Sequence, residues 1–287
     1  MSSIKIIHQQ IVQKILPRAL ESSDVHAWWI LEHVTGQKKE ILLFSDFLIT
    51  LDQQKEIDEI IYQFIFEQKP LQYLFKKIPF GDLELFVEPP ILIPRHETEE
   101  WVFWLCGQLI SYKNATLKIL DIGTGSGCIA LTLAKFLPNS EIVALDISEE
   151  ALKLAQKNAH YNNIKNVTFL QSDLFSNIKN NIIFDVIVSN PPYISFNEYE
   201  FIDESVKKWE DPRALFCHDE GLETIKKIIT QAPKYLKKNN KNFPALCIEI
   251  GHMQGRVVQE IMHNNNFKNV TIFKDMATKD RLVVGYL

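Results

Sequence analysis

The sequence TLKILDIGTGSG (residues 116–127) predicts a short buried strand that ends in a glycine-rich turn. The three glycines of the turn allow the backbone to approach a ligand closely and to adopt positive φ without a clash. A helix is expected directly afterwards, over residues 128–136, because Ile129, Leu133 and Phe136 share one helical face. A strand, a glycine turn and a helix in succession indicate an α/β unit with a ligand site at the strand's carboxyl end.

The same alternation of strand and helix continues to the end of the chain. It predicts an α/β fold: a mostly parallel, Rossmann-like sheet covered by helices on both faces, with an antiparallel strand at the C-terminus. The expected strands are residues 141–145, 167–170, 185–189, 245–250, 270–274 and 282–286. One helix is expected to include residues 151–159, where apolar side chains share one face. Two more are expected at residues 222–236 and 254–264.

The first seventy residues predict helices that pack on one another. We expect Asp24 to cap a helix that Gly36 ends, and Asp52 to cap another that Pro70 stops. An apolar stripe at three- and four-residue intervals runs along the first helix: Ile4, Ile7, Ile11 and Ile15.

The segment between the helices and the α/β part predicts a β-hairpin. FGDLELFV (residues 80–87) alternates apolar and polar residues around a Gly-Asp turn, and Pro89, Pro90 and Pro94 exclude a helix after it. We therefore expect three parts: a small N-terminal helical domain at residues 1–72, a hairpin connector at 73–94 and a catalytic domain at 95–287.

Composition excludes several classes of protein. Hydrophobic residues make up 46% of the chain and charged residues 23%, as in ordinary globular proteins. The longest apolar run, residues 101–106, is too short to cross a bilayer, and the N-terminus carries no secretory signal. The four cysteines form no C-x-x-C pair, which disfavours a disulfide framework or a cysteine-based metal site and fits the cytoplasm. The net charge of −5 argues against a surface built to neutralise phosphates.

Acidic residues follow the next two strands. Cys128 stands where a dinucleotide fingerprint requires glycine, so the turn disfavours a pyrophosphate and leaves a small adenosyl ligand without phosphates open. Asp146, about twenty positions beyond the turn, is placed to accept hydrogen bonds from ribose hydroxyls. Asp173 is placed to meet the exocyclic amine of an adenine. Taken singly, the turn could be a tight connection, Asp146 a helix cap and Asp173 a solvated loop residue.

The tetrapeptide Asn190-Pro191-Pro192-Tyr193 follows the strand at residues 185–189. The two prolines fix the backbone and lack N–H groups, so the side-chain oxygen of Asn190 and the carbonyl oxygen of Pro191 are two free acceptors. They match the two donors of a planar –NH2 group and would aim its nitrogen lone pair at an electrophile. The ring of Tyr193 offers an aromatic wall that tolerates a sulfonium cation.

This tetrapeptide and the glycine turn resemble the S-adenosylmethionine-dependent methyltransferases that modify planar amino groups. More narrowly, the chain resembles the protein-(glutamine-N5) methyltransferases of peptide chain release factors, a class I methyltransferase family. The further matching stretches are Pro70–Leu74, Ile93–Glu99, Asp211–Leu215, Asp219–Leu222, Glu249–Gly251, Gln254-Gly255, Lys274-Asp275 and Asp280-Arg281. The departures from the family pattern are Lys76 for a glycine, His96 for a proline, Leu174 for a common aromatic residue, and residues 216–218 for a glycine-rich turn.

The resemblance implies the roles of individual residues. S-adenosylmethionine would be the cofactor, with Asp146 on its ribose and both Asp173 and Leu174 along its adenine. Its methionine end would be bordered by Gly123, Thr124, Gly125, Ser126 and Gly127, and Asn190 would also border the cofactor. The catalytic residues would be Asn190, Pro191 and Tyr193, which with Pro192 would hold the glutamine amide of a Gly-Gly-Gln motif for in-line displacement.

Other functions remain open at this stage. Glutamine methylation of a ribosomal protein is the nearest alternative, followed by N6-adenine methylation of nucleic acid and by a catalytically silent binding protein. The net charge and the lack of a dense basic block beyond residues 234–238 disfavour nucleic acid. We expect a cytoplasmic monomer whose partners are release factors, without bound metal, direct nucleic-acid binding or membrane association.

Overall fold

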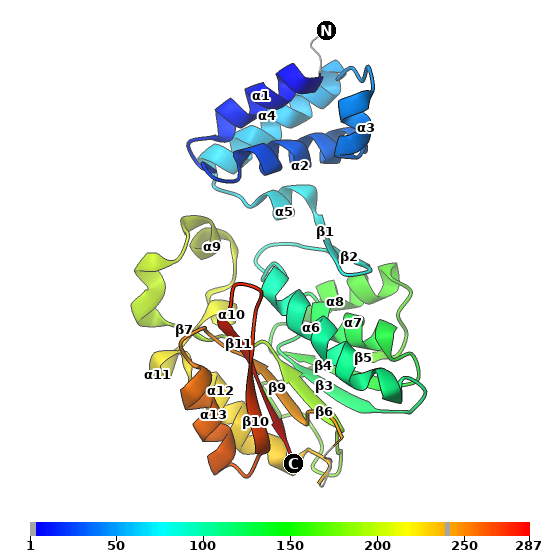
Figure 1. The fold of residues 1–287 in the computed structure, drawn as a ribbon, viewed down its shortest axis with the longest axis vertical. Helices are drawn as coiled ribbons and strands as arrows, with labels where there is room; N and C mark the ends of the chain where they lie inside the picture. The colour runs from blue at the N-terminus through cyan, green and yellow to red at the C-terminus, as the bar shows by residue number, and fades with distance from the viewer. Residues whose placement is uncertain (1–3, 239–241) are drawn as a thin grey trace. The chain divides into compact units, whose positions relative to one another are not determined.

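The computed structural model describes residues 4–238 and 242–287, which fall into two compact units (Figure 1). The first unit contains the residues up to Lys76 together with Asp203–Trp209. The second contains Lys77–Ile202 and Glu210–Leu287.

The first unit is a cluster of helices around its own apolar core. The isoleucine stripe of the first helix is buried, with Ile4, Ile7, Ile11 and Ile15 each 5% exposed or less. They pack with Ala27, Leu31 and Ile57 of the neighbouring helices. The predicted helical face is therefore confirmed. The helices of this unit are α1 (Ile4–Ile15), α2 (Ser23–Thr35), α3 (Lys39–Phe44), α4 (Leu51–Phe66), α5 (Leu71–Phe75) and α9 (Glu204–Trp209).

Two predicted helix caps, Asp24 and Asp52, are wrong. Helix α2 already begins at Ser23, so Asp24 lies inside its first turn. Helix α4 is capped by Thr50 rather than Asp52: the Thr50 hydroxyl accepts from the Gln53 N–H, and the Gln53 side chain accepts from the Thr50 N–H. This reciprocal capping box satisfies two otherwise unpaired donors, which a lone Asp52 cap would not.

Positive φ angles occur at or directly after two of the family departures. Lys76, which stands in place of a glycine, ends α5 with φ 64°. Asp219 and Glu220, which follow residues 216–218, have φ 58° and 53°. Glycine adopts such angles without the steric cost that a Cβ atom incurs, so these residues hold strained backbone conformations.

The second unit is built on a seven-stranded sheet with the order β10-β11-β9-β6-β3-β4-β5. The strands β9, β6, β3, β4 and β5 run parallel, and β11 is antiparallel to both β9 and β10. This confirms the mostly parallel sheet with an antiparallel C-terminal strand. The sheet strands are β3 (Lys118–Ile122), β4 (Glu141–Asp146), β5 (Val167–Gln171), β6 (Val186–Ser189), β9 (Leu246–Glu249), β10 (Lys268–Lys274) and β11 (Asp280–Tyr286).

Helices cover both faces of this sheet, with α6, α7 and α8 on one face and α12 and α13 on the other (Figure 1). The predicted helix at residues 222–236 is shorter in the structure, because Pro233 cannot donate to the α-helical hydrogen-bond ladder. The helices are α6 (His96–Leu109), α7 (Cys128–Phe136), α8 (Glu149–Tyr161), α10 (Pro212–Leu215), α11 (His218–Gly221), α12 (Glu223–Gln231) and α13 (Gly255–Asn264). Three 3-10 turns add η1 (Ile110–Tyr112), η2 (Phe196–Phe201) and η3 (Ala232–Lys234).

Two short strand pairs complete the unit. The predicted hairpin is confirmed: β1 (Lys77–Phe80) pairs antiparallel with β2 (Leu83–Phe86) across a Gly81-Asp82 turn. The strands β7 (Ile194–Ser195) and β8 (Phe216–Cys217) pair in parallel beyond the main sheet.

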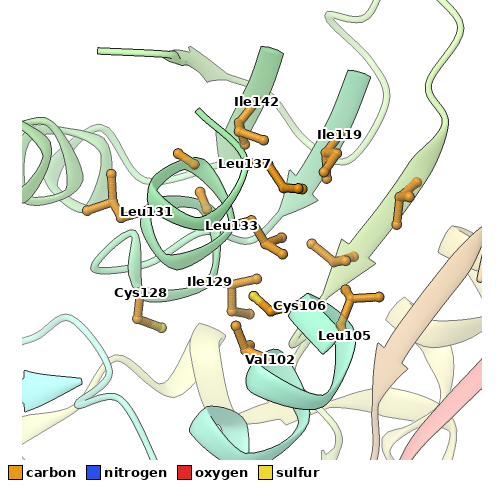
Figure 2. Close-up of a cluster of buried hydrophobic side chains, with 14 of the residues drawn as sticks. Val102, Leu105, Cys106, Ile119, Cys128, Ile129, Leu131, Leu133, Leu137 and Ile142 are labelled. Atoms are coloured by element: carbon orange, nitrogen blue, oxygen red, sulfur yellow. The ribbon is translucent and has the colours of Figure 1, made fainter. Parts of the chain in front are cut away.

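The core divides into one apolar cluster on each face of the sheet. Along β3, Ile119 belongs to the cluster formed with α6 and α7, whereas Leu120 belongs to the cluster formed with α12 and α13. Figure 2 shows Val102 and Leu105 of α6 packed toward Ile129 of α7 in the first cluster. Strands buried on both faces tend to be apolar along their length, which explains Val186–Val188 in β6 and Ile119-Leu120 in β3, where Asp121 is the buried exception.

The order of the sheet fixes where a ligand can bind. From β3, the chain adds β4 and β5 on one side, and then β6 and β9 on the other. Open parallel sheets bind ligands at such a reversal, outside the carboxyl ends of the strands. The Ser189 hydroxyl donates to the Ile122 carbonyl oxygen over 2.8 Å, which ties the ends of β6 and β3 together. No helix among the described residues is both long and apolar enough for a membrane span.

The core cluster between α6 and α7 predicts a clear difference between two truncations in α6. Leu105 is 0% exposed, so Leu105→Ala should lower the free energy of unfolding by about 2–5 kcal/mol. Gln108 is exposed on the same helix, so Gln108→Ala should change it by less than about 0.5 kcal/mol. Urea unfolding of the full chain measures both, and equal effects would contradict this packing.

Candidate active site

A pocket of about 330 Å³ opens at the carboxyl edge of the parallel strands. Its lining comes from the segments that follow β3, β4, β5 and β6, which are far apart in sequence. The chemistry-bearing residues that line it are Gly123, Gly125, Asp146, Asp173, Asn190 and Pro191. The sheet therefore brings the predicted glycine turn and the predicted tetrapeptide to one site.

The glycines of the turn play different parts. All three have positive φ, at 73° for Gly123, 56° for Gly125 and 87° for Gly127. A Cβ atom on Gly125 would meet nothing within 4 Å, so this face of the turn is open to a ligand. A Cβ atom on Gly127 would lie 3.1 Å from Ala155, so Gly127 serves the packing of α8 instead. A Cβ atom on Gly123 would lie 3.9 Å from the carbonyl oxygen of Asn190.

Asp146 holds the glycine turn against the end of β4. Its two carboxylate oxygens accept from the N–H groups of Gly125 and Ser148, each over 2.9 Å. Ser148 is the N-cap of α8 through its hydroxyl, so Asp146 is not needed for that task. Burial raises the pKa of Asp146, and the hydrogen bonds from Ser148 and Gly125 oppose that rise.

Asp121 is a fully buried carboxyl at the base of the turn. One oxygen accepts from the Thr124 hydroxyl over 2.7 Å and from the Ala130 N–H over 3.2 Å. Among residues 4–238 and 242–287, the other oxygen has no hydrogen-bond partner. Burial raises the pKa of Asp121 to about 7.

The tetrapeptide is held from both sides. The amide nitrogen of Asn190 donates to the Thr98 hydroxyl over 3.2 Å, and the Tyr193 hydroxyl donates to Glu249 over 3.3 Å. The side chain of Gln254 donates to the Tyr193 carbonyl oxygen over 2.9 Å. Burial raises the pKa of the Tyr193 phenol, so it stays protonated and is able to donate.

Several predicted site residues do not line this pocket. Thr124 and Ser126 are absent from the lining. The Thr124 hydroxyl instead donates to Asp121, and the carbonyl oxygen of Ser126 accepts from Asn158 over 2.9 Å. Gly127 and Tyr193 are likewise absent from the pocket lining. By contrast, Asp173 and Leu174 both border the pocket, as does Pro192.

Part of the lining was not predicted from the sequence. Ile91 and Leu92 reach the pocket from the proline-rich segment, and Asp211 and Arg213 reach it from the start of α10. The Arg213 guanidinium is paired with the Asp211 carboxylate, at 2.6 Å for the shortest contact. These two residues belong to Asp211–Leu215, one of the stretches that resemble the family, so this part of the lining could have been predicted from that resemblance.

The arrangement suits an adenosyl ligand. Apolar side chains of Ile91, Ile147, Leu174 and Ile228 line the pocket beside the Asp146 carboxylate. The only cationic side chain among the lining residues, Arg213, is already paired, so the described part of the pocket offers little to a phosphate. The described residues contain no group of three or more histidine, cysteine or acidic side chains placed to hold a metal ion.

Comparisons with known proteins agree with this geometry. A family model described as "Methyltransferase domain" matches residues 113–280. A protein from Flavobacterium psychrophilum named "Release factor glutamine methyltransferase" is 37% identical, and the alignment covers 98% of each chain. A protein of the same name from Lactococcus lactis is 42% identical over 81% of this chain and 83% of its own.

Among solved structures, the hMettl16 catalytic domain in complex with MAT2A 3′UTR hairpin 6 has a TM-score of 0.55 to this chain. The two are 16% identical, over 83% of this chain and 82% of that one. At this level of identity the likeness concerns the fold, and it supports the Rossmann-like class I methyltransferase architecture.

The contacts of Asp146 predict a loss of ligand binding when its carboxylate is removed. Asp146→Ala should weaken the affinity for S-adenosylhomocysteine by about tenfold to a hundredfold, because two hydrogen bonds that shape the turn are lost. Isothermal titration calorimetry measures the affinity, with the exposed Glu149→Ala on α8 as control. Equal affinities for the two variants would contradict the assignment.

The burial of Asp121 predicts a pH dependence of stability. Between about pH 4 and pH 7 the folded chain keeps the proton that the unfolded chain has released, so raising the pH lowers the free energy of unfolding by up to ~1.4 kcal/mol per unit. The Asp121→Asn side chain does not titrate, so the variant should not lose stability in this way. The free energy of unfolding of the variant minus that of the wild type should therefore rise over this range and level off above about pH 7. Urea unfolding at several pH values measures this, and a constant difference would contradict it.

Proposed function

The chain belongs to the release factor glutamine methyltransferase family and is an S-adenosylmethionine-dependent methyltransferase, and we propose that it methylates a glutamine of peptide chain release factors. The acceptor is the side-chain amide nitrogen (N5) of the glutamine in a Gly-Gly-Gln motif, and the transfer is an in-line displacement. The nitrogen bonds to the methyl carbon as the carbon–sulfur bond breaks, S-adenosylhomocysteine leaves, and one of the two amide protons is released. Because release factors act in translation, we place the reaction in the cytoplasm.

One observation carries this proposal: Asn190 and Pro191 border the same pocket as the open glycine turn. Asn190 follows β6 and Gly123 follows β3, and these two strands are neighbours in the sheet. A group held by Asn190 would therefore lie beside a ligand held by the turn, as a transfer between two bound molecules requires.

The pocket residues have defined tasks toward the cofactor. S-adenosylmethionine supplies a methyl group on a sulfonium ion, which is already an electrophile. Asp146 would accept hydrogen bonds from the ribose, and the apolar side chains of Leu174 and Ile147 would pack against the adenine, with Asp173 close to its amine. The open face of Gly125 would border the methionine end.

The tetrapeptide would act on the glutamine by orientation. An amide nitrogen is a poor nucleophile, because its lone pair is conjugated with the carbonyl group. Two acceptors, the Asn190 side-chain oxygen and the Pro191 carbonyl, would hold both hydrogens and favour loss of that conjugation. Tyr193 would contribute through its hydrogen bond to Glu249 rather than as part of the pocket wall.

We assign partner recognition to the N-terminal helical domain, residues 1–72, since one glutamine side chain offers little specificity. Residues 73–94 are then the connector and residues 95–287 the catalytic domain. The enzyme is proposed to act as a monomer on a protein substrate, without direct nucleic-acid contacts.

A labelling experiment tests the proposed substrate. The chain is incubated with methyl-labelled S-adenosylmethionine and, separately, a release factor, ribosomal proteins and RNA or DNA, and the labelled residue is mapped by mass spectrometry. Label on the Gly-Gly-Gln glutamine is expected. Label only on a ribosomal protein or on adenine would replace the proposed substrate.

The role of Asn190 predicts a separation of catalysis from cofactor binding. Asn190→Ala should lower kcat for release factor methylation by at least about a hundredfold, because one of the two acceptors is removed. The affinity for S-adenosylhomocysteine should change by less than about threefold. Turnover close to that of the wild type would refute the role of this side chain.

A further inference from the structure

Glu249 is a buried carboxylate next to the tetrapeptide. It is the last residue of β9, the neighbour of β6, and only 1% of it is exposed. One of its oxygens accepts from the Thr98 hydroxyl and from the Trp101 indole N–H, each over 2.7 Å. The other accepts from the Tyr193 hydroxyl over 3.3 Å. The three donors replace part of the hydration that Glu249 loses, and burial still raises the pKa of this group.

Thr98, in the first turn of α6, connects this carboxylate to Asn190. Thr98 is 1% exposed, and its single hydroxyl hydrogen is directed at Glu249. A hydroxyl that has given away its hydrogen can only accept further hydrogen bonds. The partner of Thr98 on its other side is the amide group of Asn190, at 3.2 Å, so that group must present its nitrogen to Thr98.

This order of donors determines which way round the Asn190 amide is held. With the nitrogen committed to Thr98, the oxygen is the free end of the group. Among residues 4–238 and 242–287, no donor hydrogen-bonds to that oxygen. If the amide rotated by half a turn, its NH2 group would face the substrate NH2 group, and two donors would oppose each other.

We propose that Glu249 and Thr98 are positioning residues that lock the Asn190 side chain with its oxygen toward the substrate amide. This inference rests on the proposed function for the identity of the substrate. Glu249 acts through Thr98 and touches neither substrate nor cofactor. Its bond to Tyr193 holds the other end of the same tetrapeptide, so one carboxylate fixes both ends of the acceptor segment.

Three variants separate this role from a merely structural one. Thr98→Val keeps the shape of the side chain but removes the hydroxyl, so kcat should fall by about tenfold to a hundredfold at unchanged KM for S-adenosylmethionine. Thr98→Ser restores the hydroxyl and should recover kcat to within about threefold. Trp101→Phe is the matched control, because it removes a donor from the same oxygen of Glu249 outside the path to Asn190, and kcat should stay within about threefold.

A second readout does not depend on activity. In protein labelled with 15N-asparagine, the side-chain signals of Asn190 are identified by their disappearance in Asn190→Ala. In the wild type, the proton directed at Thr98 should exchange with solvent more slowly than in Thr98→Val by about tenfold. Calorimetry with S-adenosylhomocysteine should give the same affinity for the wild type, Thr98→Val and Thr98→Ser to within about threefold.

The outcomes distinguish the two proposals. If the wild type methylates the release factor and Thr98→Val does so equally fast, the positioning role is overturned and the proposed function stands. If the wild type methylates no release factor but the Asn190 proton is protected only when Thr98 has its hydroxyl, the proposed function fails and the lock stands. Fast exchange of that proton in the wild type overturns the lock without any variant, even if Thr98→Val does not fold.

Discussion

The parallel pairing of β3 with β6 is the constraint on which the site depends. Ile122 is directly opposite Ser189 in this pairing, so the glycine turn and Asn190, which follow these two residues, leave the sheet side by side. In the sequence, 66 positions separate Gly123 from Ser189. Neither segment alone makes a transferase. The turn gives a place where backbone and ligand can approach closely, and the proline-fixed tetrapeptide gives two acceptors in a fixed orientation. A shift of one residue in this pairing would turn Asn190 away from the pocket.

The carboxyl edge of the sheet buries several acidic groups, and each is tied to part of the site. Asp121 supports the turn through Thr124, Asp146 supports it through Gly125, and Glu249 supports the tetrapeptide. Burial of a carboxylate is unfavourable unless hydrogen bonds replace its hydration, and here those bonds come from the backbone and side chains that must be held still. The buried carboxyl groups therefore lower the stability of the fold and, through the same hydrogen bonds, fix the positions of the turn and the tetrapeptide.

Much of the second unit could be predicted from sequence because its signals are local. Apolar runs gave the parallel strands, glycines gave the turn after β3, and Asn190-Pro191-Pro192-Tyr193 stood out at the end of β6. The rest depends on contacts between distant residues. Thr98 and Glu249 are 151 positions apart, and no pattern around either of them indicates their hydrogen bond. The packing of α9 with the first helical unit is of the same kind, since Trp209 donates to the carbonyl oxygen of Glu67 far away in the sequence. The capping box at Thr50 was local, but two neighbouring polar residues competed for the same role.

A crystal structure of the chain with S-adenosylhomocysteine and a glutamine-containing release factor segment would show whether Asn190 and Pro191 hold the substrate amide beside the cofactor. We expect the glutamine amide nitrogen to lie within hydrogen-bond distance of both the Asn190 side-chain oxygen and the Pro191 carbonyl oxygen, and to face the sulfur of the cofactor product. A glutamine held by other residues, or a cofactor product bound away from the turn at Gly123 and Gly125, would contradict this expectation.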